Sequence, residues 1–135
     1  MTNAERVAEI LKKAGTFYFL SSDGDQARGR PFSYFAMRNG RLVFGTGTHK
    51  KVFQQIEANP KVEILAPMGA KFLRYDGEIE FFEDEDFRKR TMEENPFMGK
   101  LYNEVSGLKI QFFHIRNGHA EIVSAMSTDE EFDVE

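Results

Sequence analysis

Leu73-Arg74-Tyr75-Asp76-Gly77-Glu78-Ile79-Glu80-Phe81 is the most regularly alternating stretch of the sequence, with charged residues at every second position. Successive side chains of a β-strand point to opposite faces of its sheet, so this pattern predicts a long strand with one buried and one solvated face. Antiparallel sheets commonly expose one face to water, whereas parallel sheets are usually covered on both. The stretch therefore predicts an antiparallel sheet.

Shorter apolar runs bounded by turn residues predict further strands on both sides of this stretch. They cover residues 16–21, 28–37, 42–46, 61–66, 108–116 and 119–125. Asn39-Gly40 and Asn117-Gly118 each lie between two of these runs, and Asn-Gly is the strongest short signal for a hairpin turn. Many short strands connected by tight turns favour an antiparallel barrel over a parallel sheet.

Three helices are predicted beside these strands. Thr2-Asn3-Ala4-Glu5 has the spacing of a capping box, and Gly15 is placed to end the helix that it opens. A short helix is expected to open at Gly47-Thr48 and to end at Asn59-Pro60. The third helix, over 84–94, carries acids in its first turn, where the helix dipole favours negative charge.

The chain has 135 residues, and neither a repeat nor a linker divides it. We expect a single domain over residues 1–128, followed by an acidic C-terminal tail over 129–135. Five of the seven tail residues are Asp or Glu, which favours a solvated, frayed terminus.

Several classes of protein are excluded or disfavoured by composition. No apolar run approaches the roughly 18 residues of a membrane span, and the first residues lack the apolar core of a signal peptide. The chain has no cysteine, which excludes disulfides, thiolate metal sites and thiol catalysis, and a cytoplasmic protein is expected. The three histidines lack the spacing of a metal site, and no Ser-His-Asp set is apparent. Any enzymatic reactivity is therefore expected from a cofactor.

The distribution of charge is uneven along the chain. Residues 26–56 contain no Asp or Glu, although the whole chain holds 22 acidic and 18 basic side chains. This window carries all of the following bases: Arg28, Arg30, Arg38, Arg41, Lys50 and Lys51. A local excess of positive charge on an acidic chain predicts an anion-binding site.

The short helix near Thr48 has the opposite charge to that expected at a helix N-terminus. Its first turn holds Lys50 and Lys51, whereas the helix dipole favours acids there. Exposed surface lysines and a plain cap at Thr48 would also produce this pattern. A bound phosphate would accept the free backbone N–H groups and pair with both lysines. Together with the acid-free window, the pattern favours a phosphate-bearing ligand.

The order of several short motifs resembles the pyridoxamine 5′-phosphate oxidase-like, FMN-binding split-barrel family. These motifs are Arg28-Gly29-Arg30-Pro31-Phe32, Gly40-Arg41-Leu42-Val43-Phe44-Gly45-Thr46, Lys50-Lys51-Val52, Gln55 to Glu63, and Phe72-Leu73-Arg74-Tyr75-Asp76-Gly77. The resemblance covers about residues 5–125. It implies a six-stranded antiparallel split β-barrel that forms a homodimer with FMN at the subunit interface.

The resemblance also implies which residues would hold the cofactor. Arg30 would reach the phosphate or ribityl chain of FMN, while Pro31, Phe32 and Ser33 would border the ring. Thr46 matches a polar residue that contacts the cofactor at the end of the next strand. Lys50 and Lys51 match the basic pair that holds the phosphate.

Departures from the family pattern bear on activity. Phe72 replaces the usual Trp or Gln, and residues 95–107 do not reproduce the substrate-phosphate motif of the full-length oxidases. The second of these departures concerns the substrate and not the cofactor. The family resemblance itself implies an oxidoreductase that passes a hydride between a reduced nicotinamide and an unidentified small-molecule acceptor. Phe32 and Phe72 are candidates to face the flavin ring, and Tyr102 is a candidate to line the pocket.

Two alternatives belong to other classes. A non-catalytic sensor or carrier would hold FMN or another phosphorylated cofactor in the same site. A variant of this alternative gives the fold a deazaflavin or haem-type ligand. A small barrel could also bind nucleic acid, with the basic window following phosphates and aromatic rings stacking on bases. The net charge of −4 disfavours nucleic acid as a partner.

Overall fold

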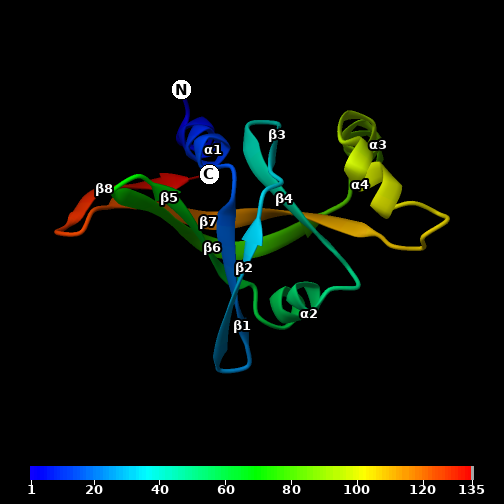
Figure 1. Cartoon of the computed structure of the whole chain (residues 1–135), viewed down its shortest axis with the longest axis horizontal. Helices are drawn as coiled ribbons and strands as arrows, with labels where there is room; N and C mark the ends of the chain where they lie inside the picture. The colour runs from blue at the N-terminus through cyan, green and yellow to red at the C-terminus, as the bar shows by residue number, and fades with distance from the viewer. Residues whose placement is uncertain (135) are drawn as a thin grey trace.

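The alternating stretch lies in β6, one of the two longest strands of an eight-stranded sheet in the computed structural model, which describes residues 1–134 (Figure 1). The strands are β1 (Phe17–Asp23), β2 (Gln26–Phe32), β3 (Ala36–Arg38), β4 (Arg41–Gly47), β5 (Lys61–Met68), β6 (Lys71–Phe82), β7 (Ile110–Val123) and β8 (Thr128–Val134). The helices are α1 (Asn3–Ala14), α2 (Lys51–Ala58), α3 (Glu85–Glu94) and α4 (Pro96–Leu101).

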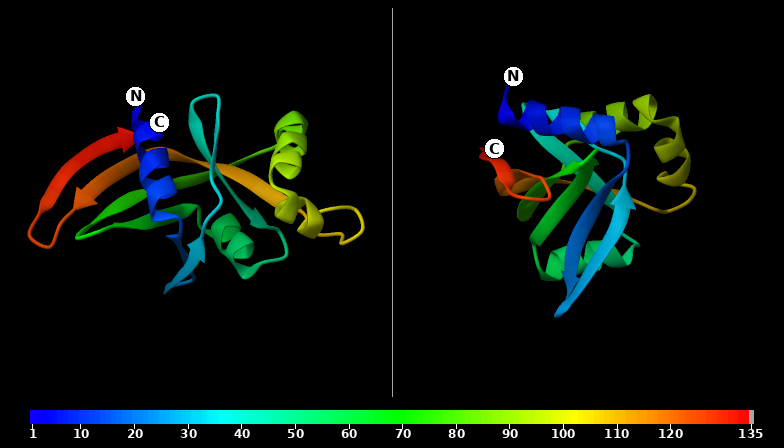
Figure 2. Two further views of the ribbon diagram at one scale, coloured as in Figure 1. Left: turned by 45° about the horizontal axis from the view of Figure 1, so that its top comes forward. Right: turned by 60° about the vertical axis from the view of Figure 1, so that its left-hand side comes forward.

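All paired strands are antiparallel, in the order β2-β1-β5-β6-β7-β4-β3, and β8 pairs with β7 beyond the end of β4. The sheet curls without closing, since no pairing among residues 1–134 joins its end strands β2 and β3. The antiparallel split-barrel prediction is confirmed, with eight strands in place of six. Figure 2 shows that β6 and β7 run the length of the molecule, with β8 at one end and α3 and α4 at the other.

Phenylalanine side chains fill the core on both faces of β7. Phe113 points into the main core, where its ring centroid lies 5.6 Å from that of Phe19 and 6.0 Å from that of Phe44. The neighbouring Phe112 points to the opposite face, as alternation requires, and packs 5.1 Å from Phe87 of α3. None of these five rings is more than 6% exposed.

The predicted strand 28–37 is interrupted in the structure. β2 ends at Phe32, which pairs with Phe17, the first residue of β1, so the chain has no partner strand beyond this point. After a short irregular segment, β3 pairs with β4 through the predicted turn at Asn39-Gly40, where both residues have positive φ. The interruption matters because it leaves Ser33 and its neighbours outside the sheet.

The predicted hairpin at Asn117-Gly118 is wrong, because β7 continues through these residues. Asn117 has φ 54°, and the register with β6 shifts opposite Asp76 and Glu78, which marks a β-bulge. Gly118 is required there because a Cβ would lie 2.7 Å from Val134 O and 2.8 Å from the ring of Tyr75. The Asn-Gly pair thus bends one strand instead of reversing the chain.

The acidic tail is not frayed, contrary to expectation. Residues Thr128–Val134 form β8, which pairs with β7, and Val134 is 2% exposed. α1 holds this strand, since Asn3 Nδ2 donates to Asp133 O at 2.8 Å and Arg6 pairs with Glu130 at 2.7 Å. Glu135, the last residue of the predicted tail, lies outside the described residues.

The helices agree with the prediction except at two places. The Thr2 capping box with Glu5 is present, and Asp84 caps α3. α2 begins at Lys51 with Lys50 as its N-cap, because Thr48 and His49 form a turn after β4. α4 is absent from the prediction, which places no helix after residue 94, and Pro96 occupies its first turn. No helix among residues 1–134 is long and apolar enough to cross a bilayer.

His114 is a buried polar residue of β7, only 2% exposed. Its Nδ1 lies 2.9 Å from Leu42 O, and because a carbonyl only accepts, Nδ1 carries the hydrogen. The Nε2 atom then faces Arg38 Nη1 at 3.5 Å. Burial lowers the pKa of His114 below its usual value, and the charges of Arg41 and Arg38 lower it further, against the raising effect of the Leu42 hydrogen bond.

We expect His114 to lower the free energy of unfolding when the pH decreases from about 8 to about 5.5. His119 acts in the opposite direction, because the hydrogen bond to Asp133 raises its pKa, so the effect of His114 is measured by comparison with a variant. The unfolded chain takes up a proton on His114 near the ordinary histidine pKa of about 6.5, while the folded chain does so only at lower pH, so acid favours unfolding. The His114→Phe variant takes up no proton at this position and should lose less stability over the same interval. Urea denaturation at both pH values tests this, and equal losses in the two proteins would contradict it.

Candidate functional site

A groove of about 260 Å³ lies where β2 and β4 end, beside α4. Five of the seven residues predicted to bind a cofactor line it, namely Pro31, Phe32, Ser33, Thr46 and Lys50. Tyr102, predicted to line a pocket, also lies there, together with Phe97 and Leu101 of α4 and Ile110 of β7. The groove therefore combines a cationic end and several hydroxyl groups with apolar walls.

Thr46 contributes an unusual buried hydroxyl to this groove. The residue is 4% exposed, and its Oγ1 has no hydrogen-bond partner within residues 1–134. A buried polar atom without a partner costs about 1–3 kcal/mol, so such an atom usually meets a ligand or a water molecule. The hydroxyl of Thr46 accordingly fits a polar group bound in the groove.

The N-terminus of α2 is the only one of the three longer described helices without a side-chain cap. Lys50 occupies the N-cap position and makes no capping hydrogen bond, and no acid lies in the first turn. By contrast, Thr2 caps α1 and Asp84 caps α3. The first backbone N–H groups of α2 therefore lack a capping side chain beside the ammonium group of Lys50, an arrangement that suits an anion.

Arg30 lies deeper, against β1 and α2. Its guanidinium donates to Phe19 O at 3.1 Å, to Ser21 Oγ at 2.9 Å and to Gln55 Oε1 at 2.9 Å. These bonds use three of the five donors of an arginine. Burial lowers the pKa of Arg30, and the charge of Arg28 lowers it further. Arg30 is thus oriented by the fold and is not among the residues that line the groove.

Lys51 lies in a neighbouring hollow of about 280 Å³, outside the groove. That hollow is lined by the β1–β2 turn and by Gln55 of α2, which also accepts from Arg30. The structure therefore separates the predicted lysine pair: Lys50 faces the groove and Lys51 the hollow.

The bases of the acid-free window fall into two groups. Arg28, Arg38 and Arg41 pair with carboxylates outside the window: with Asp23 at 3.5 Å, Asp84 at 2.8 Å and Glu80 at 3.0 Å. No ion pair within the described part of the chain involves Arg30, Lys50 or Lys51. Three of these six basic residues therefore form structural ion pairs. The other three are the ones predicted to bind a cofactor.

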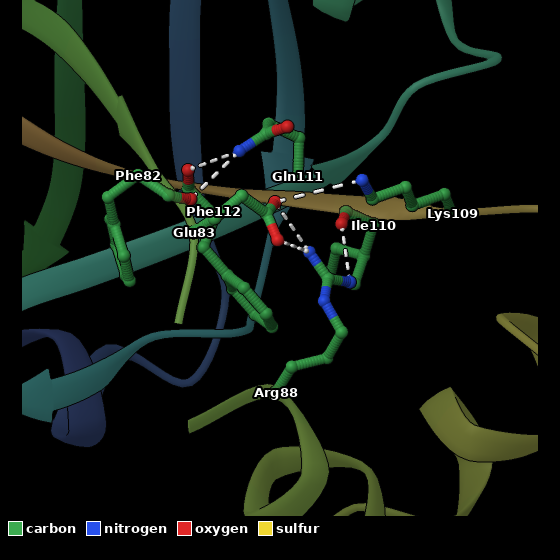
Figure 3. A network of polar contacts seen from close by, with 7 residues as sticks. All are labelled: Phe82, Glu83, Arg88, Lys109, Ile110, Gln111 and Phe112. Carbon is green, nitrogen blue, oxygen red and sulfur yellow. Dashed lines mark hydrogen bonds and ion pairs between the residues drawn. The ribbon is translucent and has the colours of Figure 1, made fainter. Parts of the chain in front are cut away.

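A polar network fixes the wall of the groove at Ile110 (Figure 3). Arg88 of α3 donates to Ile110 O at 2.8 Å and to Glu83 at 2.9 Å. Lys109 approaches the same carboxylate at 3.8 Å, and Gln111 donates to Phe82 O at 3.0 Å. These bonds hold the start of β7 to α3 and to the end of β6.

Two aromatic predictions have different outcomes. Phe32 lines the groove and stacks on Phe19, with ring centroids 4.8 Å apart. Phe72 is on β6 and does not line this groove. It pairs with Val123 of β7, and the Cζ atom of Arg74 lies 5.5 Å from the centroid of its ring. The α4 wall was missed with its helix, although a Pro at the first helical position is a recognised start signal.

Comparison with known proteins gives one family and many similar structures. The family model described as pyridoxamine 5′-phosphate oxidase matches residues 4–96. A NimC/NimA family protein from Clostridium acetobutylicum has a TM-score of 0.86 at 28% identity, covering 99% of this chain and 95% of that one. No curated protein matches.

Two more distant structures share the fold. General Stress Protein 26 from Bacillus anthracis has a TM-score of 0.65 at 16% identity, with 99% and 100% of the two chains covered. A pyridoxamine 5′-phosphate oxidase-related, FMN-binding protein from Nostoc punctiforme has a TM-score of 0.59 at 13% identity, with 97% and 96% covered.

Proposed function

The chain belongs to the pyridoxamine 5′-phosphate oxidase family, and from this membership and the groove we propose that it is an FMN-binding oxidoreductase. It would transfer a hydride between a reduced nicotinamide and a small-molecule acceptor. The observation that carries the proposal is the buried, unpartnered hydroxyl of Thr46 in one groove with Lys50 at the uncapped start of α2.

The residues of the groove fit a flavin mononucleotide. Lys50 and the backbone N–H groups of α2 would bind the phosphate, because charge-assisted bonds at a helix N-terminus stabilise anions. Thr46 would bond a polar atom of the cofactor, and Pro31 and Phe32 would lie against its ring. Bound FMN would supply the hydride-transfer chemistry, while the protein orients it and shields it from water.

We propose that a second copy of the chain covers the groove, with FMN at the interface of the homodimer. Phe97 is 75% exposed and Leu101 is 42% exposed, and both lie on the groove wall formed by α4. Exposed apolar side chains beside a ligand site are typical of an interaction surface. The FMN-binding protein from Nostoc punctiforme, which shares the fold, agrees with a flavin as the ligand. A cytoplasmic location remains a prediction.

The first test is titration of the purified 135-residue chain with FMN, monitored by fluorescence quenching and by the visible spectrum. We expect stoichiometric quenching and then anaerobic bleaching of the bound flavin by a reduced nicotinamide. Quenching without bleaching would favour the non-catalytic carrier. A chain that neither quenches FMN nor copurifies with it would contradict both forms of the proposal.

A further inference from the structure

Two side chains converge over Gly47, the last residue of β4. A Cβ at this glycine would lie 2.5 Å from His49 Cε1, 2.8 Å from His49 Nδ1 and 2.9 Å from Tyr102 Oη. The two ring centroids are 6.3 Å apart. The imidazole nitrogen and the phenol oxygen thus flank one small space, close enough for a single water molecule to bridge them.

Tyr102 is the residue after α4 and lines the groove, and it also lines a neighbouring hollow beside α3. Its hydroxyl lies beside Gly47, the residue that follows Thr46 of the groove. No hydrogen bond of its hydroxyl occurs within residues 1–134. Burial raises the pKa of Tyr102 above its usual value, so the phenol keeps its proton at neutral pH. It is therefore available to donate a hydrogen bond or a proton to a bound molecule.

Other candidates for a proton donor are few. The residues that line the groove include no carboxylate and no histidine. Lys50 lies at the start of α2, where the proposed phosphate would engage it. Tyr34 also lines the groove, but its hydroxyl is buried and has no hydrogen-bond partner within residues 1–134, whereas Tyr102 lies beside the solvent-exposed His49. His49 is exposed to solvent and lies beside Tyr102.

We propose that Tyr102 is the proton donor to an acceptor in the groove and that His49 returns a proton from solvent to its oxygen. This rests on the hydride transfer proposed above. The acceptor class is a quinone or a related conjugated carbonyl compound, because its oxygen takes a proton and its planar apolar body suits the wall formed by Phe97 and Leu101 of α4.

The step balances in atoms and electrons. The acceptor gains two electrons and one hydrogen as a hydride from the reduced cofactor, which is oxidised. The O–H bond of Tyr102 breaks as an O–H bond forms on the acceptor, and a quinone becomes a hydroquinone. The tyrosinate then takes a proton from one ring nitrogen of His49, and the exposed imidazole regains a proton from solvent water.

Tyr102→Phe tests the donor with two acceptors. The reduced, FMN-loaded protein is mixed anaerobically with menadione, a quinone, or with ferricyanide, which takes electrons without protons. We expect reoxidation by menadione to slow by about 100-fold or more, the usual contribution of general acid catalysis, while reoxidation by ferricyanide is unchanged. Both acceptors are compared at saturating FMN and after full reduction, so that a change in FMN affinity does not enter the comparison. An unchanged menadione rate would overturn the proposal.

His49→Gln tests the return of the proton. We expect slower turnover with menadione, a larger solvent isotope effect and recovery when free imidazole is added, which a merely structural role would not produce. Gly47→Ala adds a methyl group between the side chains of His49 and Tyr102, within 2.9 Å of both. It should therefore also slow reoxidation of the reduced protein by menadione. Gly29→Ala is the matched control, because its methyl would meet only Leu20 at 3.7 Å.

A second readout needs no turnover. In the ¹³C spectrum of protein labelled at tyrosine Cζ, the signal that Tyr102→Phe removes should shift when FMN binds. A signal that stays fixed at FMN saturation would overturn the placement of the hydroxyl. If the wild type fails to bind FMN or to be bleached, the proposed function itself fails. If it does both and Tyr102→Phe behaves as wild type, only the proton-donor proposal fails.

Discussion

Lys50→Glu is expected to raise the dissociation constant of FMN by about 10- to 100-fold. The substitution removes a charge-assisted bond to the phosphate, worth about 1.5–3 kcal/mol, and each 1.4 kcal/mol corresponds to a factor of ten. It also places a carboxylate at the N-cap of α2, in the groove that would hold the anion. Fluorescence titration measures the effect directly.

The separation of the two lysines makes this expectation specific. Lys51→Glu should weaken binding less than Lys50→Glu, because Lys51 lines the neighbouring hollow. The double variant should show the largest loss. Riboflavin, which lacks the phosphate, should bind wild type and Lys50→Glu equally. Lys89→Glu, on an exposed position of α3, is the charge-matched control. Equal FMN affinity for Lys50→Glu and this control would remove Lys50 from the phosphate site.

Phe113→Ala is expected to lower the free energy of unfolding by about 3–5 kcal/mol, the usual cost of deleting a buried phenylalanine ring. Phe113 is 0% exposed and lies among the rings of Phe19, Phe44 and Phe81. Because β7 pairs with β6 and β4 beside this residue, the cavity would lie where the core joins three strands. Urea denaturation measures the change.

Phe97→Ala is the matched control for this loss of stability. The same ring is removed, but Phe97 is 75% exposed within one copy of the chain. The free energy of unfolding should therefore change little when denaturation is measured at protein concentrations too low for a second copy to bind. Similar losses for the two variants would mean that exposure in the structure does not describe the packing of these rings.

Local pattern predicted the elements whose signals are complete within a few residues. The alternation in β6, the Thr2 capping box and the Asn39-Gly40 turn each depend on neighbours in the chain, and each is confirmed. Pairing across the sheet could not be predicted in this way. Asn117-Gly118 has the same letters as a hairpin turn, and only the long partner β6 makes it a bulge.

The acidic tail shows the same limit. Its charge indicates a solvated segment, yet Arg6 and Lys71, both distant in sequence, pair with Glu130 and Asp129 and let it join the sheet. At the candidate site, the charge pattern predicted Lys50 and Lys51 as one pair, but it could not show that they line different hollows. Adjacent side chains at the start of a helix point in different directions, and only the fold determines which one meets the groove.

The six-residue helix α4 has no buried residue, although it forms one wall of the groove. A molecule held between α4 and the ends of β2 and β4 would add the contacts that the helix lacks. By mass action, a ligand that binds only the folded form stabilises it in proportion to the logarithm of its concentration. Occupancy of the groove would therefore decide how often α4 opens by local unfolding. A ligand that binds the groove more tightly would leave α4 unfolded for a smaller fraction of the time.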